Sequence, residues 1–354
     1  TDIQEKKPFS NDKTQEYASS AIYYFKSIKI LKESISYVLT NEIKTNGEYY
    51  VSMCYKFIFN YDGKVLVYPL EHFMQWGTPQ DFEEYSLQSR IFRNLIKKRN
   101  EISIESNLII PMAGLGQRFK NEGYKEIKPL IKVSGKPMII QALETLPKFN
   151  KYHFVINQNM QDKSKLMKGI IKKYEDIKFI QLNKSTNGQA TTIKKGLESF
   201  SVDSKISIIS CDNGYIIDEN ELNKIKKKDF DLLVWVSSNY PYAKLNPDSY
   251  GWVYYENETI HKVSVKRIEK SDYKKAVITG GFTFSNSDIF NQCYSALIEN
   301  NNIVNGEYYA DSLVEEALKL RLKCKLMFVN CYISWGTPKE LKTFNYWKSC
   351  FDKW

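Results

Sequence analysis

The chain has 354 residues, of which 51 are Lys or Arg and 41 are Asp or Glu, giving a net charge of +10; 42% of the residues are hydrophobic and 26% are charged. This composition is that of a soluble globular protein with room for two domains, or for one large domain and a further piece. No apolar run approaches the roughly 18–20 residues that span a bilayer and no secretory signal opens the sequence, which excludes membrane insertion and favours the cytoplasm.

The basic charge does not indicate a nucleic-acid partner. Lys residues are spread through the chain, and the tight basic runs at 95–100 and 224–228 are short, whereas nucleic-acid-binding domains gather such residues in one patch or stripe. The charge therefore favours small anionic substrates. The six Cys are scattered, without a C-x-x-C pair or a His at zinc spacing, so we expect reduced thiols and no zinc site. Nothing in the sequence indicates the oligomeric state.

The first 83 residues repeat the end of the chain. "NGEYY" and "WGTP" both occur twice, at an offset of 259. Gly47 precedes Trp76 by the same spacing that separates Gly306 from Trp335. A register kept over about eighty residues predicts an internal duplication. We therefore interpret 1–83 as the C-terminal part of an upstream unit.

The remaining organisation follows from this repeat. Residues 84–104 are basic and helical in pattern, and we expect a helical linker there. Residues 105–354 then form a complete domain. Two explanations of the partial copy stay open, because the sequence begins with Thr: it is a piece of a tandem protein, or the gene has lost a half.

Strands and helices alternate between 107 and 213. Such alternation predicts a parallel sheet with helices on both faces, and ligands of these sheets bind at the carboxyl ends of the strands. The pattern predicts strands at 107–113, 152–157, 177–182 and 205–213, and helices at 137–146, 163–174 and within 187–200.

The pattern changes after residue 230. Aromatic, strand-like segments separated by turns predict a mixed, partly antiparallel lobe. We expect strands at 231–238, 251–257, 259–268, 277–285 and 325–333, and helices at 288–299, 307–320 and from 338. The fold class is therefore α/β, with a Rossmann-like mixed, mainly parallel sheet flanked by helices and a partial duplicated unit at the N-terminus.

A glycine turn follows the first of these strands. Gly114 and Gly116 in "AGLGQRF" let backbone N–H groups close on an anion without a Cβ in the way. Arg118, within the loop, adds a guanidinium with fork geometry, and Lys128, before a Pro, adds the point charge of an ammonium. Such a pair suits the oxygens of a triphosphate. A dinucleotide fingerprint is excluded because Phe119 occupies the third glycine position, and a P-loop because no G-K-[ST] follows.

Asp212 ends a buried strand in "SCDN". A helix cap or turn is one interpretation. At the carboxyl end of a strand that faces the glycine turn, a magnesium ligand is the better one, because Mg²⁺ prefers one or two carboxylates together with phosphate oxygens.

These motifs resemble the signature of the sugar-phosphate nucleotidyltransferases, which include thymidylyl- and cytidylyltransferases for sugar 1-phosphates and choline phosphate. The resemblance rests on "GLGQRF", "KPL" and "GKP" and covers about 107–345. It implies the nucleotide-diphospho-sugar transferase fold, with CTP, UTP or dTTP as the nucleotide. It further implies that the phosphates bind to Gly114, Leu115, Gly116, Arg118 and Lys128, and the base to Ala113 and Gln189.

The resemblance also implies a metal and an acceptor site. Asp212 corresponds to the family's Mg²⁺ ligand, but Ser334 stands where a second Asp often occurs, which leaves Glu307 and Asp311 as substitutes. The family's acceptor-phosphate Lys falls on Lys266 or Arg267, between which the sequence does not choose. Further acceptor contacts are expected from Gly281 and Glu307.

The implied reaction joins an NTP to a phosphorylated sugar or another small phosphate ester and releases pyrophosphate, for surface polysaccharide (capsule or lipopolysaccharide) synthesis. Two alternatives stay open. A glycosyltransferase of the related nucleotide-sugar fold normally carries D-x-D, a spacing that "CDNGYIID" lacks. A non-catalytic module that binds nucleotide or holds an assembly together suits the truncated upstream copy.

Overall fold

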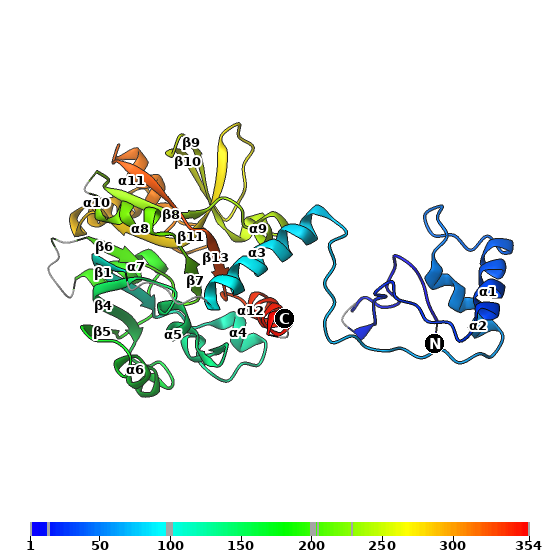
Figure 1. The fold of residues 1–354 in the computed structure, drawn as a ribbon. Coiled ribbons are helices and arrows are strands. Elements are labelled where there is room, and N and C mark those ends of the chain that lie inside the picture. The colour runs from blue at the N-terminus through cyan, green and yellow to red at the C-terminus, as the bar shows by residue number, and fades with distance from the viewer. Residues whose placement is uncertain are drawn as a thin grey trace. The chain divides into compact units, whose positions relative to one another are not determined.

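The computed structural model describes residues 2–12, 15–96, 102–198, 203, 205–227 and 229–352 (Figure 1). The chain forms two compact units, Thr1–Gln75 and Trp76–Trp354, which we describe separately. The boundary lies before the "GTP" segment, whereas the sequence predicted it at 83/84. No helix within the described ranges is long and apolar enough to cross a membrane.

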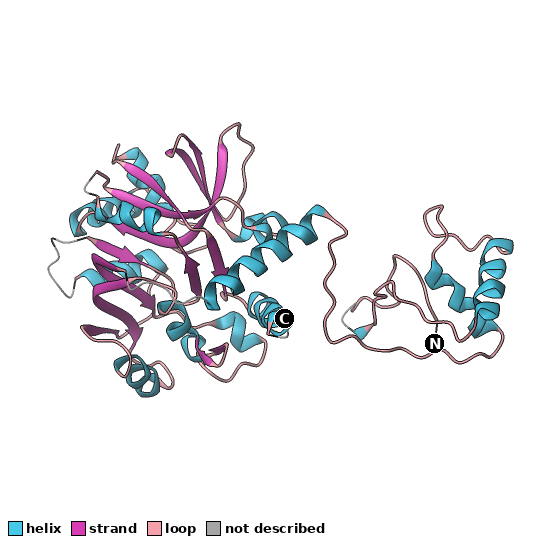
Figure 2. Cartoon of the chain, in the orientation of Figure 1, coloured by secondary structure: helices cyan, strands magenta, loops and turns pink. Residues whose placement is uncertain are grey.

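The N-terminal unit consists of helices and loops (Figure 2). It contains α1 (Ile28–Thr40), the 3₁₀ helix η2 (Val51–Cys54) and α2 (Tyr55–Asn60). Its small core centres on Val38, Met53 and Cys54, with Phe25, Tyr37, Ile43 and Tyr50 packed around them.

Local structure recurs where the sequence repeats. In both copies an isolated antiparallel bridge closes the "NGE" turn, Thr45 with Glu48 and Val304 with Glu307. The helix before that turn has 13 residues each time, α1 in the first copy and α10 (Ser287–Glu299) in the second. Similar local sequence explains similar local geometry, so the duplication stays a prediction that this recurrence supports.

The two copies differ in their strands. Segments 65–69 and 72–75 align with β12 (Cys324–Phe328) and β13 (Cys331–Ser334), but no strand forms there in the described part of the N-terminal unit. In the second unit those strands pair with β8 (Leu232–Ser237) and β7 (Asn213–Ile216). The sequence repeat does not include these partners, so the copy lacks the hydrogen bonds that make its segments strands.

The second unit is built on one mixed sheet, which has nine strands among the described residues. β11 and β10 run against the other strands, so the sheet is mixed, and the predicted Rossmann-like α/β fold with flanking helices is confirmed. In spatial order the strands are β5 (Ile177–Leu182), β4 (Lys148–Asn157), β1 (Ser103–Met112), β6 (Ile206–Ile208), β11 (Lys274–Phe284), β8, β12, β10 (Thr259–Val265) and β9 (Gly251–Glu256).

Helices pack on the sheet, whose central strands are buried. Apolar side chains of α7, α10 and α11 form one core with alternate residues of the strands. Beyond α10, the helices are α3 (Pro79–Ile96), α4 (Gln117–Asn121), α5 (Met138–Leu143), α6 (Lys163–Ile171), α7 (Gln189–Leu197), α8 (Glu219–Lys226), α9 (Pro241–Leu245), α11 (Ser312–Lys319) and α12 (Pro338–Phe351), with 3₁₀ turns η3 (Lys128–Leu130) and η4 (Pro247–Ser249) and a small ladder of β2 (Lys132–Val133) and β3 (Lys136–Pro137).

Three predicted elements differ from the observed ones. The strand expected at 205–213 ends at Ile208, and Asp212 lies in the turn between β6 and β7. The strand expected at 325–333 is two strands in different sheets, because the chain leaves the ladder with β8 after Phe328 and pairs with β7 from Cys331. The helix expected at 307–320 begins only at Ser312, because the tight turn that ends at Glu307 occupies the chain before it.

The segment predicted as a linker is also different. Residues 84–96 belong to α3, which packs on α9, α12 and β13 of the second unit instead of standing between units. Residues 97–101 lie outside the described residues, and β1 then begins at Ser103, earlier than the predicted 107.

Gly281 is a packing position in β11. A Cβ there would lie 2.7 Å from the indole of Trp235, which is fully buried. The indole N–H of Trp235 donates to Thr283 Oγ1 at 3.1 Å, so the ring cannot turn aside freely. Gly281 is therefore required by close packing between β11 and β8.

We predict that Gly281→Ala destabilises the second unit by about 1–3 kcal/mol, the usual cost of overpacking a core, and lowers its melting temperature. Gly169→Ala is the matched control: Gly169 is exposed within α6, and a Cβ there meets no atom within 4 Å. That change should raise stability by up to about 1 kcal/mol. A Gly281→Ala chain as stable as wild type would contradict this packing role.

Candidate active site

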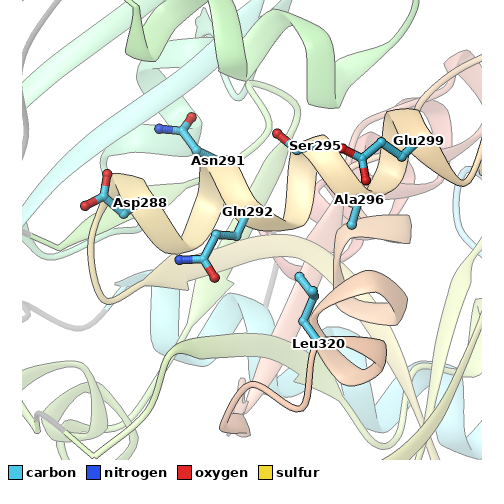
Figure 3. Close-up of a pocket in the computed structure, with 7 residues that line it drawn as sticks. All are labelled: Asp288, Asn291, Gln292, Ser295, Ala296, Glu299 and Leu320. Atoms are coloured by element: carbon cyan, nitrogen blue, oxygen red, sulfur yellow. The ribbon is translucent and has the colours of Figure 1, made fainter.

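Two cavities were compared. The smaller, of about 450 Å³, lies along the exposed side of α10 (Figure 3). Most of its lining side chains follow one another along that helix, and Leu320 comes from the chain after α11. Side chains that line up on one helix do not converge on a ligand. The larger cavity, of about 1390 Å³, lies where the predicted site residues gather.

The larger cavity contains most of the residues singled out in the sequence. It opens beyond the ends of β1 and β6, as expected for an α/β sheet. Ten of the predicted residues line it: Ala113, Gly114, Leu115, Gly116, Arg118, Lys128, Gln189, Asp212, Lys266 and Glu307.

The glycine turn connects β1 to α4. Gly116 has a left-handed backbone (φ 63°), which favours glycine. A Cβ at Gly116 would lie 3.1 Å from Lys128 Cβ, so the turn packs directly on that lysine. Leu115 at the tip is 60% exposed. Arg118 is exposed in α4 and forms no hydrogen bond or ion pair with any residue that the structure describes, which leaves its guanidinium available to a ligand.

Lys128 links three segments. Its ammonium donates to Asp212 Oδ2 at 2.5 Å and to the carbonyl oxygen of Gly336 at 3.2 Å. Both charged side chains are mostly buried. Asp212 is thus one side chain away from the glycine turn, close enough for the turn and the carboxylate to hold one triphosphate.

The charge of Lys128 is set by two opposing effects. Burial is the largest single effect and lowers the pKa of Lys128, but the charge and hydrogen bond of Asp212, together with Cys211, outweigh it and leave the pKa above its ordinary value. The lysine is therefore charged at neutral pH and can bind phosphate.

A second loop closes the cavity near Gln189, the first residue of α7. Its side-chain amide donates to Ser210 Oγ at 3.1 Å. Gly188, before it, has φ 119°, and a Cβ there would lie 2.5 Å from the carbonyl oxygen of Tyr308. This glycine lets the loop meet the "GEYY" segment, where Ala190 N–H donates to the same carbonyl at 3.0 Å.

Lys266 and Asp311 also line the cavity. Lys266 follows β10 in a left-handed conformation, and its ammonium donates to the carbonyl of Ser249 and lies 5.5 Å from the centre of the Tyr309 ring. Asp311 Oδ2 lies 2.3 Å from the position that a Cβ of Gly251 would take, so only glycine fits beside it.

The surroundings shift the pKa values of both groups. Burial raises the pKa of Asp311 to about 6, and Lys266 partly offsets this. Burial lowers the pKa of Lys266. The nearby Asp311 carboxylate raises it in part, and the positive charge of Arg118 lowers it further. A carboxyl group and an amine that both lose solvation beside an open cavity are typical of a ligand-binding site.

The structure does not bring two of the predicted acceptor residues to the cavity. Arg267 is exposed and pairs with Glu269 at 2.9 Å, so of the two alternatives only Lys266 lines the cavity. Gly281 packs on Trp235, and its neighbour Gly280 lines the cavity instead.

The sequence interpretation missed one wall of the cavity. Glu84 and Gln88 of α3, the expected linker, line it together with Tyr242. Tyr242 O–H donates to Glu84 Oε1 at 2.8 Å, and Gln88 donates to the Tyr242 oxygen at 2.9 Å. Glu340 of α12 was missed as well. No local motif marks Glu84 or Gln88, which reach the site through long-range packing. Glu340 stands in a T-x-x-E capping pattern, which indicates a helix start and not a ligand site.

Comparison with known families decides the class of this site. The sequence profile of the family described as Nucleotidyl transferase matches residues 108–323, more than half of the chain. The chain belongs to the nucleotidyl transferase family. The predicted family and enzyme class are therefore confirmed, and the protein is a nucleotidyltransferase. No curated protein sequence matches it.

Solved structures share the fold of this nucleotidyltransferase. The nucleoside-diphosphate-sugar pyrophosphorylase from Vibrio cholerae RC9 is similar at 18% identity and TM-score 0.55, over 67% of this chain and 98% of its own. The inositol-1-phosphate CTP transferase from T. maritima has 16% identity and TM-score 0.55 (69% and 96%). A UDP-glucose pyrophosphorylase complexed with UDP-glucose has 16% identity and TM-score 0.52 (71% and 100%).

Asp311 should make stability depend on pH. Its folded pKa of about 6 exceeds the ordinary 3.8, so its contribution to the free energy of unfolding is fully present below 3.8 and is lost as the pH rises through 6. Asp311→Asn cannot ionise. We predict that the variant gains melting temperature relative to wild type between about pH 4.5 and pH 7.5. A difference that does not change with pH would contradict this environment.

Proposed function

We propose that this nucleotidyltransferase joins an NTP (CTP, UTP or dTTP) to a sugar phosphate or another small phosphate ester and releases pyrophosphate. The observation that carries the proposal is the convergence of the glycine turn, Arg118, Lys128 and Asp212 in one cavity large enough for both substrates. A site for triphosphate alone would not need the second cationic end at Lys266.

In this proposal the nucleotide's phosphates lie over the glycine turn. Backbone N–H groups of Gly114–Gly116 face them, the free Arg118 guanidinium binds oxygens in fork geometry, and Lys128 contributes a point charge. The Lys128 ammonium keeps part of its contact with Asp212, while a phosphate oxygen replaces one of the two acceptors to which it donates. The base lies toward Ala113 and Gln189.

The acceptor phosphate binds at Lys266, and one of its oxygens attacks the α-phosphorus. A new P–O bond forms there, the bond to the β-phosphate bridging oxygen breaks, and pyrophosphate carries that electron pair away. A phosphate monoester has a second pKa of about 6 and is already largely dianionic at neutral pH, so no general base is required. Alignment and charge neutralisation then supply the catalysis.

Mg²⁺ is the cofactor that the family resemblance implies, and the donors at Asp212 fit it. The carboxylate lies 3.0 Å from the position that a Cβ of Gly336 would take, so glycine leaves room beside the oxygen. Carboxylate and phosphate oxygens are the ligands that Mg²⁺ prefers. Bound there, the ion would neutralise phosphate charge during the transfer.

The finer biological role follows from the resemblance alone. It suggests that the activated product serves surface polysaccharide synthesis. We also propose that the N-terminal unit descends from the C-terminal part of a second nucleotidyltransferase unit, which the repeated sequence and the repeated local geometry support. That unit carries no counterpart of the glycine turn or of Asp212 in this chain, so the proposed activity belongs to the second unit.

We predict that Arg118→Ala, Lys128→Ala and Asp212→Ala each lower kcat/KM for pyrophosphate release by about 10²–10³-fold, because each removes charge stabilisation of the transferring phosphate. The assay pairs CTP, UTP and dTTP with a panel of phosphate esters. Lys120→Ala is the control for Arg118, since Lys120 is exposed in the same helix and does not line the cavity. Sugar transfer from a nucleotide sugar without pyrophosphate release would indicate a glycosyltransferase, and nucleotide binding without turnover a non-catalytic module.

Lys266→Met tests the acceptor end separately. We predict that it raises the KM for the phosphate ester at least about tenfold, through the loss of a charge-assisted contact, while the KM for the NTP changes little. Lys262→Met is the matched control, because Lys262 lies on β10, the strand that Lys266 follows, is half-exposed and pairs with Glu269. An equal effect of both variants, or an effect of Lys266→Met on the NTP alone, would contradict the assignment.

A further inference from the structure

Ser334 leaves the expected metal site short of a carboxylate. It is the last residue of β13, and its hydroxyl accepts a hydrogen bond from Gly336 N–H at 3.3 Å. A neutral hydroxyl is a weaker ligand for a hard dication than a carboxylate. The substitutes that the sequence left open, Glu307 and Asp311, line the cavity. A different carboxylate, Glu340, borders the same glycine, Gly336, as Asp212 does.

The space beside Gly336 brings three oxygens together. The position that a Cβ of Gly336 would take lies 3.0 Å from Asp212 Oδ2, 3.4 Å from Glu340 Oε2 and 3.5 Å from Ser334 Oγ. The two carboxylate oxygens are therefore no farther apart than the sum of the first two distances. Any other residue at 336 would fill this space with carbon, so glycine keeps it open between two negative charges.

Only one of the two carboxylate oxygens of Glu340 takes part in capping its own helix. It is the third residue of α12, and its N–H donates to the hydroxyl of the N-cap residue Thr337. The sequence repeat contains the equivalent pair Thr78 and Asp81. There the carboxylate of Asp81 accepts from both the N–H and the hydroxyl of Thr78, which completes the reciprocal hydrogen bonds of a capping box.

In α12 the capping box is incomplete. Glu340 accepts from the Thr337 hydroxyl at 2.9 Å, and among the described residues no hydrogen bond joins it to the Thr337 N–H. Its other oxygen instead accepts from Tyr250 O–H at 3.1 Å. The tyrosine holds the carboxylate over the cavity, beside Gly336 and Asp212.

A cation already lies in this region. The Lys128 ammonium bonds both Asp212 and the Gly336 carbonyl. Two carboxylates with one ammonium leave a net charge of −1, which a divalent ion converts to +1 before the polyanionic substrate arrives. A site with Asp212 alone would instead become doubly positive.

We propose that Glu340 is the second carboxylate of a divalent-cation site at Asp212 and takes the place that Ser334 leaves without a charge. The proposal rests on the proposed function, from which the cation at Asp212 comes. Mg²⁺ accepts one or two carboxylates and keeps its remaining positions for water and phosphate, so two carboxylates are sufficient. Rotation of the three side-chain bonds of Glu340 supplies the final approach.

The experiment measures Mn²⁺ binding to the full chain by electron paramagnetic resonance, where the signal of free Mn²⁺ falls as the ion binds. Mn²⁺ shares the oxygen ligands and octahedral geometry of Mg²⁺. We expect one saturable site whose dissociation constant rises at least about tenfold in Glu340→Gln and in Asp212→Asn. Gln is the right replacement because it serves at the third helix position as Glu does, so the melting temperature checks that α12 is intact.

Three further variants sharpen the assignment. Glu307→Gln removes another carboxylate of the same cavity and should leave Mn²⁺ binding unchanged. Lys128→Met removes the competing ammonium and should tighten binding. Adding Ser334→Asp to Glu340→Gln should restore it, because the serine oxygen borders the same space.

The outcomes separate the two proposals. If Asp212→Asn loses Mn²⁺ while Glu340→Gln binds it as wild type does, Glu340 is not a ligand and the proposed function stands. If neither wild type nor Lys128→Met binds Mn²⁺, both the cation site at Asp212 and the role of Glu340 in it are overturned. Pyrophosphate release, measured on the same samples, then decides the proposed function independently.

Discussion

The bond between Lys128 and Asp212 joins the parts of the chain on which the cavity depends. Lys128 follows the glycine turn, Asp212 follows β6, and the same ammonium reaches the Gly336 carbonyl before α12. Removal of one member of a mostly buried ion pair leaves the other charge uncompensated, which typically costs 3–5 kcal/mol. The pair thus fixes the distance between phosphate turn and carboxylate, and it stores opposite charges that phosphate and a cation can separate.

Sheet topology brings residues from late in the chain beside this pair. β11 lies antiparallel between β6 and β8, so a strand from late in the chain passes beside the end of β6. The "GEYY" segment then packs on the loop before α7, through backbone bonds between Tyr308 and both Asn187 and Ala190. The lining of one cavity therefore comes from halves of the unit that are distant in sequence.

Sequence reasoning succeeded where chemistry is local. The sequence correctly places the glycine turn, Lys128 and Asp212 at one cavity, because the end of a strand and the residues after it define where these groups lie. It could not separate Gly280 from Gly281, because the register of β11 against β8 shifts between Ile278 and Gly281, and this irregularity decides which glycine faces the cavity. Glu84 lies on a helix that looked like a linker, and only tertiary packing directs it to the site.

The repeated segment explains why α3 became part of the cavity wall. α3 and α12 both begin at the Pro of a "GTP" sequence, with the Thr before it capping the helix. Trp335, just before the second "GTP" sequence, is fully buried, whereas Trp76, just before the first, is 54% exposed. The apolar side of α3 packs instead on α12, where Phe92 stacks with Phe351. Glu84, which accepts from the Trp347 indole N–H at 2.8 Å, is thereby held at the cavity edge.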